Sequence, residues 1–464
     1  MDELAFVISL TSLLVIPLIA YVLLKNTLLD ITYLRDNPWP LLWYFTLAIV
    51  LVPLVIVSAL GIENTPGLYK AQPGTESLVA LIVITTLIEY VVALAFSLRL
   101  FKLRFRRDIV GKPLSEKRLH EVAFALALFG LLILVLFYLL GYKHAFLSAL
   151  LEKRRLLEVR LANKYASHVP SQIAAILPLV GYILCALAGY IGRKKLLQSF
   201  GYLALGILFL SAPGDKAPPI WGIIIWVLAQ GALLPKRVLS VRSVIGLGLI
   251  SIVGLGAVFL VTSIQVPGMT RDMFLRYLLV RLGVGQMAGV YETFGLVQAN
   301  SLPEGDFWLH MIPGARFVVD YTDYQKVLMM VTEGYGYAKM GVKNTLFIAE
   351  AWAIGGLPLA LFSPIMVGIS TGIGLAVLVL VVRRIVGKGL APSIALLLYL
   401  KTHNITGGFS SFPLFKGLIL TLGYVVIIIV WYYLFVCSRK LLIPSAAIKR
   451  QSPQREFEAR KVVR

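Results

Sequence analysis

The chain has 464 residues, of which 59% are hydrophobic, and a formal net charge of +21. An ordinary soluble domain is only about 45–50% apolar, so the composition excludes a soluble globular protein. The two cysteines, Cys185 and Cys437, stand in or at the end of apolar runs, which argues against a disulfide framework and a thiolate metal site. The sequence predicts an all-α, polytopic membrane protein.

Residues 1–268 contain the first predicted membrane helices, eight in all. A bilayer needs about 20 apolar residues as helix. Runs of that length cover 4–24, 40–61, 77–100, 122–142, 170–192 and 244–264, and two shorter candidates cover 196–210 and 219–234. Asp2 and Glu3 precede the first run, where a cleavable signal peptide carries positive charge, so we expect this run to remain as a membrane helix.

Residues 346–437 contain the last predicted membrane helices. An apolar run at 346–382 is followed by a short run at 390–400 and an ordinary span at 415–436. As one continuous helix the first run would be about 55 Å long, too long for one upright crossing. The places where it can bend are Gly355, Gly356, Pro358 and Pro364. We expect one kinked crossing here, and so about eleven crossings in total. Two crossings would put the carboxy-terminal tail outside, unless the run 390–400 is re-entrant and does not cross the membrane.

Clusters of lysine and arginine orient the chain, because positively charged loops stay on the cytoplasmic side. Such clusters occur within 102–118, 193–195, 236–242 and 383–388. The amino terminus is then outside, and the basic tail, residues 438–464, is inside near anionic lipid. We therefore expect a multi-pass membrane protein with this orientation.

Two segments break this charge rule, because alternation places them outside although they carry many basic residues. The first, residues 143–169, has a leucine pattern that predicts an interfacial amphipathic helix. The second, residues 269–345, is a large polar outer region. Positive charge outside favours an anionic ligand; the alternative is that long loops are translocated regardless of charge and pair their charges locally. Substrate-binding candidates in the first segment are Arg154, Arg155 and Arg160.

Arginines of the second segment are the main candidates for holding a diphosphate. A guanidinium donates two parallel hydrogen bonds to phosphate and keeps its charge when partly desolvated. The candidates are Arg271, Arg276, Arg281 and Arg316, together with Gln286. The first three are five residues apart, so a regular helix cannot point all of them one way. Asp272 also offers Arg276 an ordinary ion pair four residues away.

A sugar hydroxyl that attacks an anomeric carbon needs a base nearby. The outer candidates are Glu292, His310, Asp320, Asp323, Glu333 and Glu350. Glu292 is the first choice because it follows the arginines closely; otherwise it is a salt-bridge partner. Glu350 stands at the entrance of a span, where an ionisable group is costly. The five histidines have no familiar metal-ligand spacing, so we predict no metal site and no cofactor, although Asp320 and Asp323 could hold a cation.

Residues 343–358 read Lys-Asn-Thr-Leu-Phe-Ile-Ala-Glu-Ala-Trp-Ala-Ile-Gly-Gly-Leu-Pro. This passage resembles the start of a span in bacterial O-antigen polymerases, O-antigen ligases and related oligosaccharide repeat-unit polymerases, where Asn-Ser/Thr precedes Glu-x-Gly-x-x-Gly. The matching residues are Asn344, Thr345, Glu350 and Gly355, while Trp352 replaces the first glycine. The ligases have an important histidine just before the asparagine, and Lys343 stands there instead, which favours a polymerase.

The resemblance implies a metal-independent polymerase that joins polyprenyl-diphosphate-linked oligosaccharide repeat units on the outer face of the membrane. Arg281 would stabilise the leaving diphosphate, and Glu292 or His310 would take the acceptor proton. The expected partners are this substrate and membrane lipids. A chain-length regulator protein is a further candidate partner, and nucleic acid is not expected.

Two other classes stay open. An O-antigen-ligase-like or other lipid-linked-sugar glycosyltransferase is the first, although the loop 61–77 lacks the adjacent acidic pair of lipid-phosphate-sugar enzymes. The second is a transporter or flippase of an anionic lipid or polysaccharide precursor. Transporters often have internal repeats and a site at mid-membrane, whereas this sequence has no repeat between its halves and concentrates its polar residues in outer segments. Binding without turnover would indicate a transporter.

Overall fold

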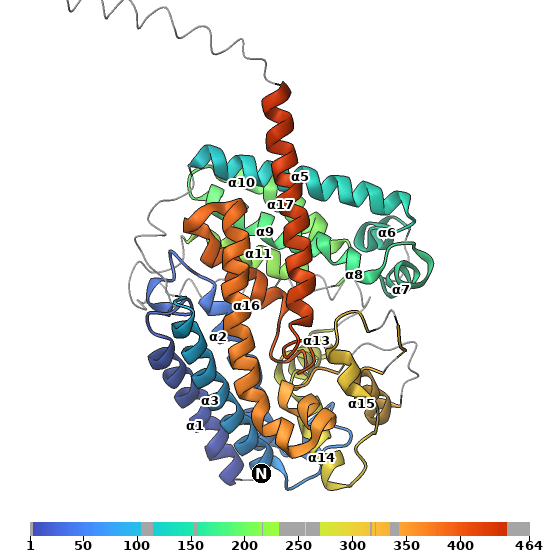
Figure 1. The fold of residues 1–464 in the computed structure, drawn as a ribbon. Helices are drawn as coiled ribbons and strands as arrows, with labels where there is room; N and C mark the ends of the chain where they lie inside the picture. Colours follow the sequence, from blue (N-terminus) through green and yellow to red (C-terminus); the bar gives the residue numbers. More distant parts are fainter. Residues whose placement is uncertain are drawn as a thin grey trace, which may run out of the picture.

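The computed structural model describes residues 3–103, 115–152, 156–215, 217–231, 256, 270–315, 318–320, 322–334 and 343–442. Within these residues the secondary structure is helical and contains no strand (Figure 1). The predicted all-α fold is therefore confirmed for the described part of the chain.

Seven helices of the described part are long and apolar enough to cross a membrane. They are α1 (Glu3–Leu24), α2 (Pro40–Leu60), α3 (Glu76–Leu100), α5 (Glu116–Leu139), α9 (Ile176–Gly192), α16 (Phe347–Thr402) and α17 (Lys416–Leu442). Two shorter apolar helices, α10 (Leu196–Ser211) and α11 (Ala217–Gln230), lie at the shorter predicted runs. The predicted span 244–264 falls outside the described residues except for position 256. These helices are compatible with the predicted integral membrane protein.

The long helix α16 is bent twice. Its backbone leaves helical geometry at Gly355 and Gly356, where the sequence predicts a bend, and again at Gly387. Gly356 and Gly387 have φ of 65° and 72°, a region that favours glycine because it lacks a Cβ. After the second bend the chain folds back, since the Tyr399 hydroxyl donates a hydrogen bond to Thr371 Oγ1 at 3.0 Å.

Close packing against α3 fixes the middle of α16, and the two helices run side by side in Figure 1. Gly368 and Gly372 face α3, where an added Cβ would lie 2.7 Å from Ala93 and 2.2 Å from Ser97. The Ser97 hydroxyl also donates to the Gly368 carbonyl at 3.1 Å. Small residues let two membrane helices approach closely, and such packing drives their association.

A second group of helices surrounds α9, which is buried over most of its length against α5, α10 and α11. Its Gly189 faces α11, where an added Cβ would lie 2.5 Å from the Trp226 carbonyl. α17 joins this group to the rest, because Trp431 donates to the Ala125 carbonyl of α5 at 2.8 Å. The described residues of the first basic segment form α6 (Ala145–Leu151) and α7 (Leu156–Ala166), followed by the short α8 (Ser171–Ala174).

The second polar segment forms a layer of short elements beside the beginning of α16 (Figure 1). They are α13 (Arg271–Leu278), the π-helix η3 (Leu279–Val284), α14 (Ala288–Gln298), the 3-10 helix η4 (Phe307–Met311) and α15 (Tyr324–Glu333). Leu296, Phe307, Tyr324 and Leu328 give this layer a small core of its own. Two further 3-10 turns, η1 (Ile31–Tyr33) and η2 (Ile62–Asn64), lie in the connections on either side of α2.

Candidate functional site

The first turn of α16 contributes the most buried member of a polar cluster, Glu350, whose side chain is 1% exposed. A carboxylate is stabilised at this position because backbone N–H groups at a helix start are unpaired and carry partial positive charge. Its Oε2 accepts a hydrogen bond from the backbone N–H of Ser410 at 3.1 Å. The residues between α16 and α17 therefore close over the beginning of α16.

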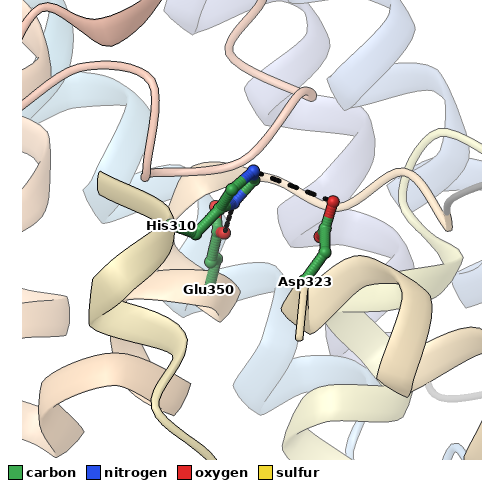
Figure 2. Close-up of side chains that lie close together, drawn as sticks. All are labelled: His310, Asp323 and Glu350. Atoms are coloured by element: carbon green, nitrogen blue, oxygen red, sulfur yellow. Dashed lines mark hydrogen bonds and ion pairs between the residues drawn. The ribbon is translucent and has the colours of Figure 1, made fainter. Parts of the chain in front are cut away.

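Two more side chains reach Glu350 from the layer of short elements beside α16. His310 belongs to η4, and its Nδ1 lies 3.5 Å from Glu350 Oε1. Asp323 caps α15 by accepting the Gln325 N–H at 3.0 Å, and its other oxygen lies 3.8 Å from His310 Nε2. Figure 2 shows the imidazole between the two carboxylates. We call His310, Asp323 and Glu350 the histidine cluster.

The loop between α16 and α17 also holds the imidazole. Ser410 Oγ lies 2.8 Å from His310 Nδ1, and Lys416 Nζ donates to the His310 carbonyl at 2.5 Å. Gly408, with a φ of 94°, lets this loop approach, because an added Cβ would lie 2.1 Å from Glu350 Oε2. These loop residues were not singled out by the sequence analysis. The polar stretch between two apolar runs is the signal that could have found them.

The histidine cluster is also where a metal ion could be held. One ligand atom from each of its three side chains lies within 4.8 Å of the other two. The sequence predicts no metal site, because its histidines have no familiar ligand spacing, although it names Asp323 among the carboxylates that could hold a cation. Only the folding of η4, α15 and α16 against one another brings His310, Asp323 and Glu350 together.

A second group of charges, the lysine cluster, surrounds Lys343. Its Nζ lies 2.6 Å from Glu292 Oε2 and 3.1 Å from Glu333 Oε1. The other oxygen of Glu292 accepts the Tyr69 N–H at 2.9 Å. Burial raises the pKa of Glu292, and the neighbouring Lys343 ammonium opposes that rise. Glu292 is fully buried, so this geometry agrees with the salt-bridge alternative, while its role as base stays a prediction.

Gln286 lies near the loop between α16 and α17. The side-chain amide of Asn344 donates to Gln286 Oε1 at 2.8 Å, and Thr406 Oγ1 lies 3.5 Å from the same oxygen. An isolated bridge between Thr345 and Gly407 runs alongside. Gln286, the start of the 343–358 passage and the loop before α17 thus form one hydrogen-bonded unit.

The predicted arginines are placed to different extents. Arg271 and Arg276 lie on α13, and Arg281 lies on η3; the structure describes the backbone of these three residues. The prediction that residues five apart point in different directions assumed a regular α-helix. Because Arg281 lies on η3, which is a π-helix with i→i+5 hydrogen bonds, that assumption does not apply to it. Arg160 on α7 pairs with Asp215 at 2.6 Å, with both side chains well exposed. The predicted Arg154, Arg155 and Arg316 lie outside the described residues.

No protein-family model, curated protein or solved structure matches this chain.

Proposed function

We propose that this protein is a glycosyltransferase that joins polyprenyl-diphosphate-linked oligosaccharide repeat units at the outer face of the inner membrane. One observation carries the proposal: two residues of the 343–358 passage each contact a residue that was predicted for the site on other grounds. Asn344 donates to Gln286, and Glu350 lies beside His310. These pairs are 58 and 40 residues apart in the chain, so sequence proximity does not explain the contacts.

In this proposal His310 accepts the proton of the acceptor hydroxyl. Its side chain is 19% exposed, against 1% for Glu350, so a substrate reaches it more easily. The 3.8 Å between its Nε2 and Asp323 Oδ2 exceeds an ordinary hydrogen bond, so an acceptor hydroxyl beside the two atoms could contact both. Asp323 and Glu350 act as positioning residues that orient the imidazole and stabilise the charge it gains.

The reaction is a direct displacement. The acceptor oxygen bonds to the anomeric carbon of the donor while the bond from that carbon to the diphosphate breaks. The diphosphate leaves with the bonding electrons, and the acceptor proton passes to His310. We assign the diphosphate to Arg271, Arg276 and Arg281, because guanidinium groups offset the charge that develops on the leaving group. Displacement of this kind inverts the anomeric configuration.

Glu292 is the other predicted base, and its contacts favour a different role. Lys343 and the Tyr69 N–H take its two oxygens, and no part of the residue is exposed. Glu292 therefore holds Lys343, and with it the neighbouring Asn344, in place. A Glu292→Gln protein that melts like the parent but has lost turnover would restore Glu292 as the base.

The test is an assay with purified protein in detergent and a short-chain polyprenyl-diphosphate oligosaccharide, with products separated by gel and identified by mass. A ladder spaced by one repeat unit is expected. An Arg281→Ala protein that stays folded should lose turnover, and Arg281→Lys should recover part of it because lysine keeps the charge but not the paired donors. Full polymerisation by Arg281→Ala would contradict the assignment of this arginine.

The same assay separates the alternatives. A single unit added to another acceptor would indicate a ligase-like or other lipid-linked-sugar transferase. Substrate that binds but stays unchanged would favour the transporter or flippase.

A further inference from the structure

The two carboxylates of the histidine cluster share one imidazole, and a further basic group, Lys416, is close by, since its Nζ donates to the His310 carbonyl. Asp323 and Glu350 have side chains that are 10% and 1% exposed. Within the described part of the chain, His310 is the one basic side chain that forms an ion pair with either of them, and one imidazole carries at most one positive charge. Buried charges are normally paired or bound to a metal, because desolvation is costly. One imidazole in direct contact does not balance two carboxylates, so a cation bound among them would stabilise the cluster.

The spacing of the three side chains suits such a cation. One ligand atom from each lies within 4.8 Å of the others. Zinc-to-oxygen and zinc-to-nitrogen bonds of about 2.0–2.2 Å in a tetrahedral site place two ligand atoms about 3.4 Å apart. Side-chain rotations that move the ligand atoms by about an ångström would bring all three to one ion.

A fourth side chain gives independent evidence that an ion can bind at this cluster. Gln325, which is 6% exposed, has an amide Nε2 without a hydrogen-bond partner among the described residues. This atom and Glu350 Oε2 lie 2.9 and 2.1 Å from the position of a Cβ added to Gly408, so the amide points at the cluster. A half-turn of the amide would present its carbonyl oxygen to a cation instead.

We infer that the histidine cluster binds a divalent transition-metal cation of the Zn²⁺ type, with Gln325 as a fourth oxygen ligand. An imidazole together with carboxylate and amide oxygens is a donor set that such ions accept. The effect on activity rests on the proposed function: an imidazole that binds the cation cannot take the acceptor proton. The cation is therefore an inhibitor of the glycosyl transfer proposed above.

Binding is tested with Zn²⁺ alone, by equilibrium dialysis of the EDTA-treated full-length protein in detergent followed by metal analysis. The parent should bind one more Zn²⁺ than an Asp323→Asn protein, which keeps the cap of α15 because asparagine also caps helices. Glu350→Gln should lose the same ion. Glu304→Gln, which changes an exposed carboxylate of the same outer segment, should bind like the parent.

The expected loss in the two cluster variants is at least about tenfold in affinity, the size seen even when outer-shell partners of a metal are removed. Melting temperatures in EDTA identify any variant that has failed to fold. Equal Zn²⁺ binding by the parent, Asp323→Asn and Glu350→Gln, or no binding by the parent, would overturn the cation site.

Turnover in EDTA tests the proposed function separately. Turnover without metal that stops when Zn²⁺ fills the site supports both inferences. Turnover that requires the cation would overturn the inhibitory role. Zn²⁺ binding to the cluster by a protein that makes no product leaves the cation site intact and removes the proposed function.

Discussion

The layer of short elements from α13 to α15 brings two groups of carboxylates to the beginning of α16, and they differ in how their charge is balanced. In the lysine cluster, one ammonium contacts Glu292 and Glu333 at 2.6 and 3.1 Å. In the histidine cluster, one imidazole lies 3.8 and 3.5 Å from its two carboxylates. Contacts as short as those of Lys343 complete an ion pair, whereas the longer separations around His310 leave its nitrogens open to a substrate or a metal ion in the function proposed above.

The basic side chains of the two clusters also differ in burial. Lys343 and Glu292 are 7% and 0% exposed, and their environment includes the ring of Tyr69, 5.2 Å from the ammonium. The His310 side chain is 19% exposed. We therefore expect changes in the lysine cluster to alter folding and changes in the histidine cluster to alter chemistry.

The largest expected effect is on turnover, in a His310→Ala protein. Removal of a general base typically lowers the rate about 10²–10⁴-fold. Because the buried carboxylates of Asp323 and Glu350 then lose their basic partner, the melting temperature should also fall, so turnover is compared at a temperature where the variant is folded. Product formation from the lipid-linked oligosaccharide measures the first effect, and thermal unfolding in detergent measures the second. A His310→Ala protein that is fully active would end the distinction between the clusters.

Stability should suffer most in a Lys343→Met protein. Removing one partner of a buried ion pair leaves the other charge uncompensated, which typically costs about 3–5 kcal/mol. The burial that raises the pKa of Glu292 would then act without the opposing lysine, so part of this cost is avoided if Glu292 binds a proton.

A double variant sharpens this test. Adding Glu292→Gln to Lys343→Met removes the uncompensated charge, so we expect it to recover much of the lost free energy of unfolding. Equal unfolding of the single and double variants would contradict an ion pair between these two residues.

The sequence predicted the scaffold better than the site. Apolar runs follow directly from composition, so the long helices and the bend at Gly355 and Gly356 agree with the prediction. His310 and Glu350 were recognised as separate candidates, but their contact across 40 residues depends on how η4 packs against α16. Sequence spacing carries no information about such a contact. The reversal at Gly387 falls in the basic segment 383–388, where the sequence predicts a loop between the runs 346–382 and 390–400.

Gly408→Ala should have an intermediate effect, confined to the histidine cluster. Alanine is strained at a φ of 94°, and its Cβ would overlap Glu350 Oε2. Overpacking in a filled site typically costs about 1–3 kcal/mol. We expect a lower melting temperature together with reduced turnover, because Glu350 must move away from His310. Gly423→Ala, where an added Cβ meets nothing within 4 Å, is the matched control and should be close to neutral.

The smallest effect on stability is expected at an ion pair in which both side chains are well exposed. Arg160 and Asp215 are 2.6 Å apart, but their side chains are 42% and 51% exposed. Exposed pairs contribute at most about 1 kcal/mol because water and salt screen them. Arg160→Ala and Asp215→Ala should therefore unfold almost like the parent.

Measurements of glycosyl transfer distinguish the two roles considered for Arg160. If it only pairs with Asp215, both substitutions leave the Michaelis constant for the lipid-linked donor unchanged. If it binds the donor phosphate, as the basic segment 143–169 predicts, Arg160→Ala raises that constant. Asp215→Ala, which frees the guanidinium from its competitor, should then lower it. Opposite shifts from the two partners of one ion pair would place Arg160 in the substrate site, since the loss of a purely structural contact would affect both variants alike.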